Sequence, residues 1–168
     1  MAIARIQPNT ATVIIGVILG LGVLTSTSMT TKVDGQAVDQ KRFVSSFQSI
    51  VNETGLLSHD YDAQVQKWQR GEHSNETMAS ITDTYSPRYQ ELINKTRDLQ
   101  TPTGYENVTN LYVKSLESEL KSNTHFRNYL ITGNTTENGA SQQSLSDALR
   151  YEIESFKAFK SVSETNNR

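Results

Sequence analysis

Residues 43–68 read FVSSFQSIVNETGLLSHDYDAQVQKW. Apolar or small side chains recur in this stretch every three or four positions, which places them on one face of an α-helix. No segment of the chain alternates between apolar and polar residues for long enough to predict a half-buried strand. We therefore expect one long helix whose apolar stripe faces a core. That stripe consists of Phe43, Phe47, Ile50, Thr54, Leu57, Tyr61, Val65 and Trp68.

A glycine lies inside this predicted helix. Gly55 should weaken the helix by about 1 kcal/mol relative to alanine, but the stripe keeps its phase on both sides of the glycine. The helix is therefore expected to continue through Gly55, with at most a bend there. It should end near Arg70-Gly71, because glycine readily takes the left-handed conformation that ends many helices.

A second run with the same spacing extends from Met78 to Leu99. Ser74 or Asn75 should cap its first turn, since either side chain can accept a hydrogen bond from a free backbone N–H. Pro87 falls inside the run and lacks a backbone donor, so we expect it to kink or split this helix.

Two further runs cover residues 105–130 and 145–162. Thr103, followed three residues later by Glu106, fits a capping box for the first of them. The second should be capped by Ser141 or Ser144, after Gly133 and a polar loop over residues 134–140. Four amphipathic helices joined by short loops predict an all-α fold, an antiparallel up-down four-helix bundle.

The first 31 residues differ from the remainder, residues 32–168, which hold the predicted bundle. No charged residue lies between Arg5 and Lys32, and residues 11–24 read ATVIIGVILGLGVL. As a helix these fourteen residues rise about 21 Å, and residues 25–29 extend the rise to about 28 Å, close to the hydrocarbon core of a bilayer at about 30 Å. One interpretation is an uncleaved single-pass membrane anchor, with Arg5 inside and the bundle outside the membrane. The other is a secretory signal cleaved within residues 25–28, which would leave a secreted bundle.

The apolar segment carries a candidate helix-packing pair. Gly16 and Gly20 stand four residues apart, the small-xxx-small spacing that lets transmembrane helices approach closely. This pair predicts association with another helix inside the membrane.

Composition excludes several classes of protein. Charged residues make up 20% of the chain and the net charge is −2, which does not fit a basic nucleic-acid-binding surface. The chain has no cysteine, so a disulfide framework and thiolate catalysis are excluded.

Five Asn-x-Thr motifs are candidate acceptors for N-glycosylation, a modification of secreted and extracellular regions. They fit an extracytoplasmic glycoprotein. The acceptor residues are Asn52, Asn75, Asn94, Asn107 and Asn134.

Tyrosines are frequent on the predicted stripes. Four of them lie on or beside these stripes: Tyr61, Tyr85, Tyr89 and Tyr112. A tyrosine-lined core could form a small-molecule pocket in which the hydroxyl groups hydrogen-bond to the ligand. The same residues could instead pack their rings inward while their hydroxyls reach water near the helix ends.

Trp68 belongs to a second candidate surface, at the end of the predicted bundle far from the apolar segment. Together with Met78 and Leu130 it could either cap the core or form an exposed patch for a partner.

Catalytic and metal-binding motifs are not apparent. The three histidines, His59, His73 and His125, are not spaced as a metal pair, and no Glu-x-x-His motif occurs. We expect His59 and His73 to be exposed and His125 to be partly buried. The prediction is therefore a protein that is not an enzyme and has no cofactor or metal ion.

Three acidic pairs, Asp60/Asp62, Glu117/Glu119 and Glu152/Glu154, stand two residues apart and do not face each other on a helix, so no carboxylate dyad is expected. Two ion-pair motifs are expected on the solvated face. Glu91–Lys95 and Glu117–Lys121 have the spacing of favourable ion pairs within a helix.

Short motifs carry a resemblance to known proteins over residues 39–160. On these motifs the chain resembles uncharacterised archaeal surface proteins that have one N-terminal anchor and a helical-bundle ectodomain. It is also similar, more loosely, to the four-helix sensor ectodomains of bacterial receptors, although the short stretch before the apolar segment leaves no room for a cytoplasmic output domain. The motifs are WQRG at 68–71, PTGY at 102–105, FRNY at 126–129 with TGN at 132–134, and YE at 151–152.

Two functions follow as hypotheses. The first is a membrane-anchored, non-enzymatic bundle that binds a partner protein or acts as an accessory subunit of a membrane complex. The second is a bundle, secreted or anchored, that binds a small ligand in its tyrosine-lined core.

Overall fold

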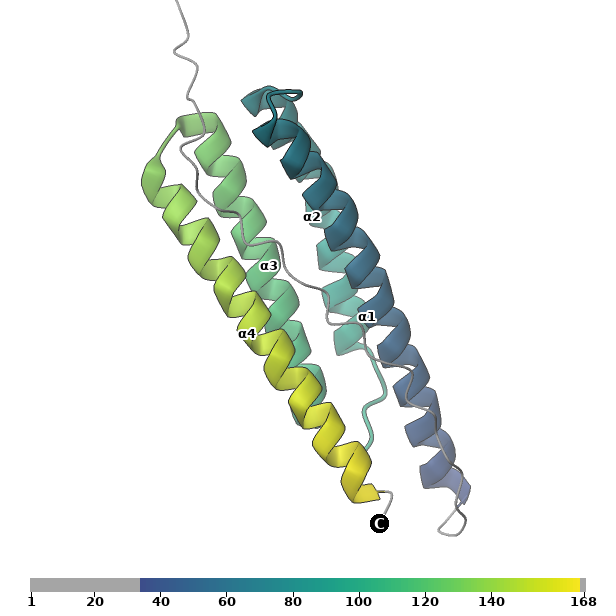
Figure 1. The fold of residues 1–168 in the computed structure, drawn as a ribbon. Helices are drawn as coiled ribbons and strands as arrows, with labels where there is room; N and C mark the ends of the chain where they lie inside the picture. The colour runs from purple at the N-terminus through teal and green to yellow at the C-terminus, as the bar shows by residue number, and fades with distance from the viewer. Residues whose placement is uncertain (1–33, 167–168) are drawn as a thin grey trace, which may run out of the picture.

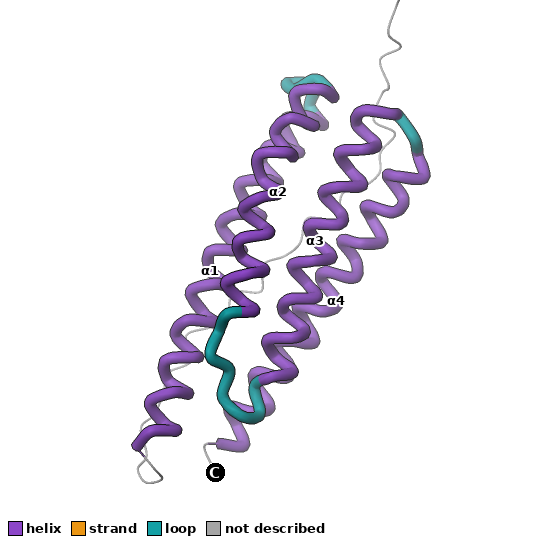
Figure 2. The backbone as a smooth tube through the Cα atoms, turned by 180° about the vertical axis from the view of Figure 1, so that it is seen from behind, coloured by secondary structure: helices purple, strands orange, loops and turns teal. Residues whose placement is uncertain are grey.

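A computed structural model of the chain describes residues 34–166. It contains four helices, α1 (Asp34–Gln69), α2 (Asn75–Arg97), α3 (Glu106–Thr132) and α4 (Thr135–Asn166), which run side by side in alternating directions (Figure 1). The described residues form no strand. The predicted all-α fold of four helices is confirmed, and the loops that join the helices lie at the two ends (Figure 2).

None of these four helices has a stretch both long and apolar enough to span a bilayer. The segment over residues 11–24, including Gly16 and Gly20, lies outside the described residues. The anchor and the signal therefore both remain predictions.

The first helix follows the predicted stripe closely. It continues through Gly55 without interruption and ends at Gln69. Gly71 then takes a φ of +77°, and the N–H of Glu72 donates to the carbonyl of Lys67 at 2.9 Å. This left-handed glycine is the predicted end of the helix. Of the eight stripe residues, all but Trp68 are buried, and Trp68 is half-buried.

The second helix starts as predicted but is not split by its proline. Ser74 is the N-cap, and its hydroxyl accepts a hydrogen bond from the N–H of Thr77 at 3.1 Å. The helix runs unbroken through Pro87, so of the two predicted effects, a kink or a split, the split does not occur. Pro87 and Asp83, whose carbonyl lacks its helical donor, are both exposed. Water can therefore replace the missing hydrogen bond while packing on the opposite face holds the helix together.

The predicted capping box of α3 is wrong. The N-cap is Tyr105, which makes no side-chain capping bond. The carboxylate of Glu106 instead accepts from the N–H of Gly104 at 2.7 Å. The turn brings the N–H of Tyr105 to the carbonyl of Pro102 at 3.0 Å and buries the Tyr105 ring, so the helix begins later than Thr103 would require.

The predicted start of α4 is also wrong. The helix begins at Thr135, and the polar residues 135–140 are its first turns rather than a loop. Asn134 accepts from the N–H of Thr136 at 3.0 Å, as an N-cap does. Ser141 and Ser144, expected as caps, are buried residues within the helix, and Ser141 contacts Ser122 of α3.

Serines hold α3 and α4 together. Ser115 donates to the carbonyl of Ala148 at 2.8 Å, and Ser122 donates to that of Ser141 at 2.9 Å. In the opposite direction, Ser155 of α4 donates to the carbonyl of Val108 at 2.8 Å. The small serine side chains allow the two helices to approach closely, and each hydroxyl donates a hydrogen bond to a backbone carbonyl of the neighbouring helix.

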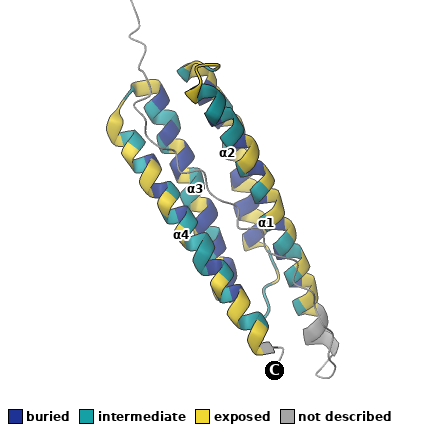
Figure 3. Ribbon diagram, viewed as in Figure 1, coloured by how far each residue is buried: buried dark blue, intermediate teal, exposed yellow. Residues whose placement is uncertain are grey.

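The contact between α1 and α4 is of a different kind. Among the described residues, no Cα atom of α1 comes within 8 Å of a Cα atom of α4. Large rings bridge the distance instead: Phe47 stacks on Phe159 with centroids 5.7 Å apart. The buried faces of all four helices point toward this shared interior (Figure 3).

The turn between α3 and α4 generates a first prediction. Gly133 has a φ of +69°, so Gly133→Ala should destabilise the protein by about 1 kcal/mol. Gly139 is the matched control: it lies inside α4 with nothing within 4 Å of an added Cβ. Gly139→Ala should therefore stabilise the protein, by about 0.5–1 kcal/mol. Urea denaturation of both variants measures the change in the free energy of unfolding. A change of the same sign in both variants would contradict the backbone conformations assigned to Gly133 and Gly139.

Candidate functional site

The interior tyrosines occupy the place predicted for them. Tyr61, Tyr85, Tyr89 and Tyr112 are all at least nine-tenths buried, and their rings lie within the core. Three of the four hydroxyls form hydrogen bonds to side chains of the bundle. These tyrosines therefore act as packing residues with internal polar contacts.

Two of these hydroxyls join α1 to α2. The hydroxyls of Tyr61 and Thr82 lie 2.9 Å apart, and Thr82 donates to the carbonyl of Met78 at 2.9 Å. Tyr85 donates to the carboxylate of Asp60 at 2.7 Å. Burial raises the pKa of Tyr61 well above its usual value, and burial followed by the hydrogen bond to Asp60 raises the pKa of Tyr85 to about 12. Both tyrosines stay protonated over the physiological range and cannot serve as bases there.

Tyr89 belongs to a polar triad that joins three helices. Its hydroxyl donates to Oε1 of Glu119 at 2.8 Å, and the hydroxyl of Ser58 donates to the same oxygen at 2.7 Å. The Ser58 and Tyr89 oxygens are themselves 3.1 Å apart. A carboxyl group on α3 is thus held by one donor from α1 and one from α2.

Glu119 was not singled out from the sequence, although its spacing shows its position. It stands seven residues after Tyr112 and three after Leu116, both buried residues of α3, so it belongs to their face. Its neighbour Glu117 points outward instead. Enclosure of the Glu119 carboxyl raises its pKa, and the two hydroxyl donors lower that pKa by a smaller amount.

Two more carboxyl groups, Asp62 of α1 and Glu152 of α4, are half-buried. Burial raises the pKa of Asp62 despite the opposing charge of His59. Burial, followed by the negative charge of Glu119, raises the pKa of Glu152 to about 7. Within residues 34–166, none of these three carboxyl groups forms an ion pair with lysine, arginine or histidine.

Tyr112 differs from the other interior tyrosines. Its side chain is 1% exposed, and its hydroxyl has no hydrogen-bond partner among the described residues. The neighbouring hydroxyl of Thr54 donates to the carbonyl of Ile50. Burial raises the pKa of Tyr112, the nearby Thr54 hydroxyl opposes this rise, and the charges of Glu152 and Glu119 add smaller increases.

The second candidate surface forms part of the core. Met78 and Leu130 are buried, and the half-buried Trp68 packs edge-on against Phe126 with centroids 5.3 Å apart. The indole N–H donates to Oδ1 of Asn75 at 2.8 Å. Of the two alternatives that the sequence left open, Trp68, Met78 and Leu130 therefore cap the core rather than form an exposed patch.

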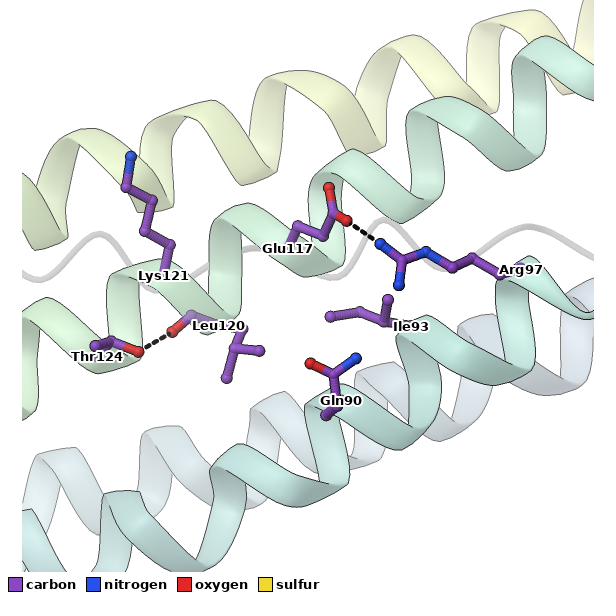
Figure 4. A pocket seen from close by; sticks show the side chains of 7 residues that line it. All are labelled: Gln90, Ile93, Arg97, Glu117, Leu120, Lys121 and Thr124. Atoms are coloured by element: carbon purple, nitrogen blue, oxygen red, sulfur yellow. Dashed lines mark hydrogen bonds and ion pairs between the residues drawn. The ribbon is translucent and has the colours of Figure 1, made fainter.

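An open groove of about 340 Å³ lies elsewhere, between α2 and α3. Figure 4 shows Gln90, Ile93 and Leu120 pointing into the space between the two helices. Ile93 is 1% exposed and Leu120 is half-buried, so the floor is apolar. None of the four core tyrosines lines this groove. Its polar rim consists of Gln90, Arg97, Glu117, Lys121 and Thr124.

The rim corrects one predicted ion pair. Glu91 and Lys95 pair at 3.0 Å as expected, but Glu117 pairs with Arg97 of α2 rather than with Lys121. Glu117 pairs with Arg97 across the groove, and not with Lys121 on its own helix, because α2 and α3 lie side by side there. Lys121 forms no ion pair with another described residue.

The histidines occupy structural positions. His59 is exposed, as predicted, but His73 is half-buried, with Nε2 3.1 Å from Oε1 of Gln64. His125 is half-buried as expected, and its Nδ1 lies 2.8 Å from Oε2 of Glu137. Within the described residues, no three His, Asp or Glu side chains gather as a metal ion would require.

The five acceptor asparagines differ in their surroundings. Four of them are exposed, whereas Asn75 is half-buried and accepts the indole hydrogen bond of Trp68. In three motifs the threonine is a buried core residue whose hydroxyl donates to the backbone one turn earlier; these are Thr54, Thr96 and Thr109. Packing thus accounts for those threonines whether or not the asparagines carry glycans.

No protein-family model matches the chain, and no curated protein or solved structure matches it either. Function is therefore inferred from the residues and their geometry.

The tyrosines provide a second prediction, with a matched pair of variants. Tyr89→Phe removes a hydrogen bond to the Glu119 carboxyl and should destabilise the protein by about 1–2 kcal/mol. Tyr112→Phe removes a hydroxyl that has no partner, so its stability should stay within about 0.5 kcal/mol of the parent or rise. Urea denaturation at one fixed pH measures both. A larger loss for Tyr112→Phe than for Tyr89→Phe would contradict the hydrogen-bond assignments.

Proposed function

We propose that the bundle is the extracytoplasmic, non-enzymatic part of a membrane-anchored protein, and that it binds a partner protein through the groove between α2 and α3. The groove is the observation that carries this proposal. It combines an apolar floor, formed by Ile93 and Leu120, with a polar rim that can position a partner's side chain.

The form of the groove favours a protein partner over a small molecule. It is open to solvent along two helices, whereas small-molecule sites enclose most of their ligand. An inserted apolar side chain would cover Leu120, and hydrogen-bonding groups around it could pair with Gln90 and Thr124 on the rim.

The alternative, a small ligand in the tyrosine-lined core, has less support. The hydroxyls of Tyr61, Tyr85 and Tyr89 already bond to side chains of the bundle, and their rings fill the core. A ligand would have to displace these contacts. Binding of a metabolite with loss of affinity in Tyr61→Phe would favour this alternative.

The membrane part of the proposal depends on residues 11–24, whose composition fits an anchor. We expect the full-length chain to remain in the membrane fraction after a carbonate wash and to be released by detergent. An external protease should then remove the bundle from sealed cells. Recovery of the chain in the medium, shortened at its N-terminus, would show that the segment is a cleaved signal.

The groove is tested by blocking it. Thr124 is an exposed rim residue whose hydroxyl bonds to the backbone of its own helix, so Thr124→Arg should fill the groove without disturbing the core. We expect a partner that copurifies with the full-length chain in mild detergent to be lost with this variant. Quantitative mass spectrometry of the purified complex measures the loss.

Thr84→Arg is the matched control. Thr84 is an exposed threonine of α2 with the same kind of backbone hydrogen bond, and it does not line the groove. It should retain the partner. A parent chain that purifies alone as a monomer would contradict the proposed function, and equal retention by both variants would contradict the groove.

A further inference from the structure

Three of the five Asn-x-Thr motifs lie inside helices. In each of these three, the asparagine is exposed and the threonine is a buried residue of the core. Side chains two positions apart on an α-helix are separated by a rotation of about 200°. The threonine hydroxyl therefore faces away from the acceptor amide. The three motifs are Asn52 with Thr54, Asn94 with Thr96 and Asn107 with Thr109.

The hydroxyls of these three threonines are also engaged inside the bundle. None of the three residues is more than 7% exposed. Each hydroxyl donates to a backbone carbonyl one turn earlier, at 2.9 Å for Thr54, 2.7 Å for Thr96 and 3.0 Å for Thr109. The threonine is part of the motif that a glycosyl transferase recognises. In these three motifs it becomes accessible only when the helix opens.

The motif at Asn75 is restricted in another way. Its threonine, Thr77, is exposed, but Asn75 itself is half-buried at the first residue of α2. The Oδ1 atom of Asn75 accepts the indole N–H of Trp68 at 2.8 Å. This hydrogen bond holds the carboxamide against the ring that covers the end of the core, where little room is left for a sugar.

Asn134 is the acceptor that lies between two helices, in the turn that joins α3 to α4 (Figure 2). Asn134 and its threonine, Thr136, are both exposed. The Oδ1 atom of Asn134 accepts the backbone N–H of Thr136 at 3.0 Å, so the acceptor carboxamide lies beside the third residue of its motif. Its Nδ2 atom donates no hydrogen bond to another residue within 34–166 and is free to react.

We infer that Asn134 is the N-glycosylation site that the folded bundle presents, and that folding closes the other four motifs. In the cell this modification rests on the proposed extracytoplasmic location of the bundle. Asn134 does not line the α2–α3 groove, whereas Asn94 accepts a hydrogen bond from the rim residue Gln90 at 3.2 Å. A glycan on Asn134 therefore leaves the groove open to a partner.

The glycan donor is a lipid-linked oligosaccharide, in which the first sugar is esterified to phosphate. Nδ2 of Asn134 forms a bond to the anomeric carbon of that sugar, while the bond from this carbon to the phosphate oxygen breaks. The lipid phosphate leaves with the electron pair, and one of the two Nδ2 protons passes to a base of the transferase. No group is oxidised or reduced. Oδ1 keeps its lone pairs, so the hydrogen bond from Thr136 survives the reaction.

The test uses the purified, folded full-length chain in detergent. It is incubated with a single-subunit oligosaccharyltransferase that accepts Asn-x-Thr and with a lipid-linked oligosaccharide. Five short synthetic peptides, each carrying one of the motifs, serve as the unfolded reference. Mass spectrometry of the glycopeptides measures the rate at each asparagine. Because the components are purified, a failure here leaves the proposed membrane location standing, and a failure of export in cells leaves this inference standing.

We expect Asn134 to react in the folded chain at a rate close to that of its peptide. The asparagines inside helices should react at least about tenfold more slowly than their peptides, because the helix must first open. Comparable rates in chain and peptide at Asn52, Asn94 or Asn107 would overturn the inference. So would an unmodified Asn134 in the folded chain when its peptide reacts.

Two neighbouring exposed threonines supply matched variants. Thr136→Ala removes the third residue of the motif but keeps the backbone N–H that Asn134 accepts, so modification of the folded chain should be lost. Thr135→Ala changes the middle position of the motif, which any residue except proline can occupy, and should leave the modification unchanged. Equal modification of the two variants at Asn134 would also overturn the inference.

Discussion

The ring of Phe47 lies where three helices meet. It stacks on Phe159 of α4 and meets Tyr112 of α3 edge-on with centroids 5.2 Å apart. One turn earlier, Phe43 packs against Tyr105 at the start of α3. Because the backbones of α1 and α4 are too far apart for small side chains to touch, these rings close the bundle. The packing of α1 against α4 depends on that aromatic bridge.

The two sides of α3 show two ways of packing helices. Toward α4, serines permit close approach and bond to the facing backbone. Toward α2, larger side chains keep the surfaces apart and leave an open groove above Ile93 and Leu120 (Figure 4). Side-chain size therefore helps to decide where the surface of the bundle is closed and where it is open.

The polar side chains inside the bundle have a structural role. Glu119 accepts two hydrogen bonds from two helices, which fixes the rotational setting of α1 and α2 around α3. Its enclosure raises the pKa of the carboxyl group, and the two hydroxyl donors oppose that rise. The same polar groups thus help to position the helices.

The sequence by itself determined the elements that depend on local spacing and local chemistry. The stripe of α1, the Ser74 cap and the left-handed Gly71 require nothing beyond residues a few positions apart. The burial of the four tyrosines follows from the same periodicity.

Tertiary structure decided what depends on a neighbouring helix. Ser141 has the composition of a cap, but contact with Ser122 makes it a buried residue of α4. Glu117 pairs across the groove with Arg97 rather than along its own helix. The hydrogen bonds from Ser58 and Tyr89 to Glu119 could not be derived from spacing, because the three residues lie on three different helices and only the packing brings them together.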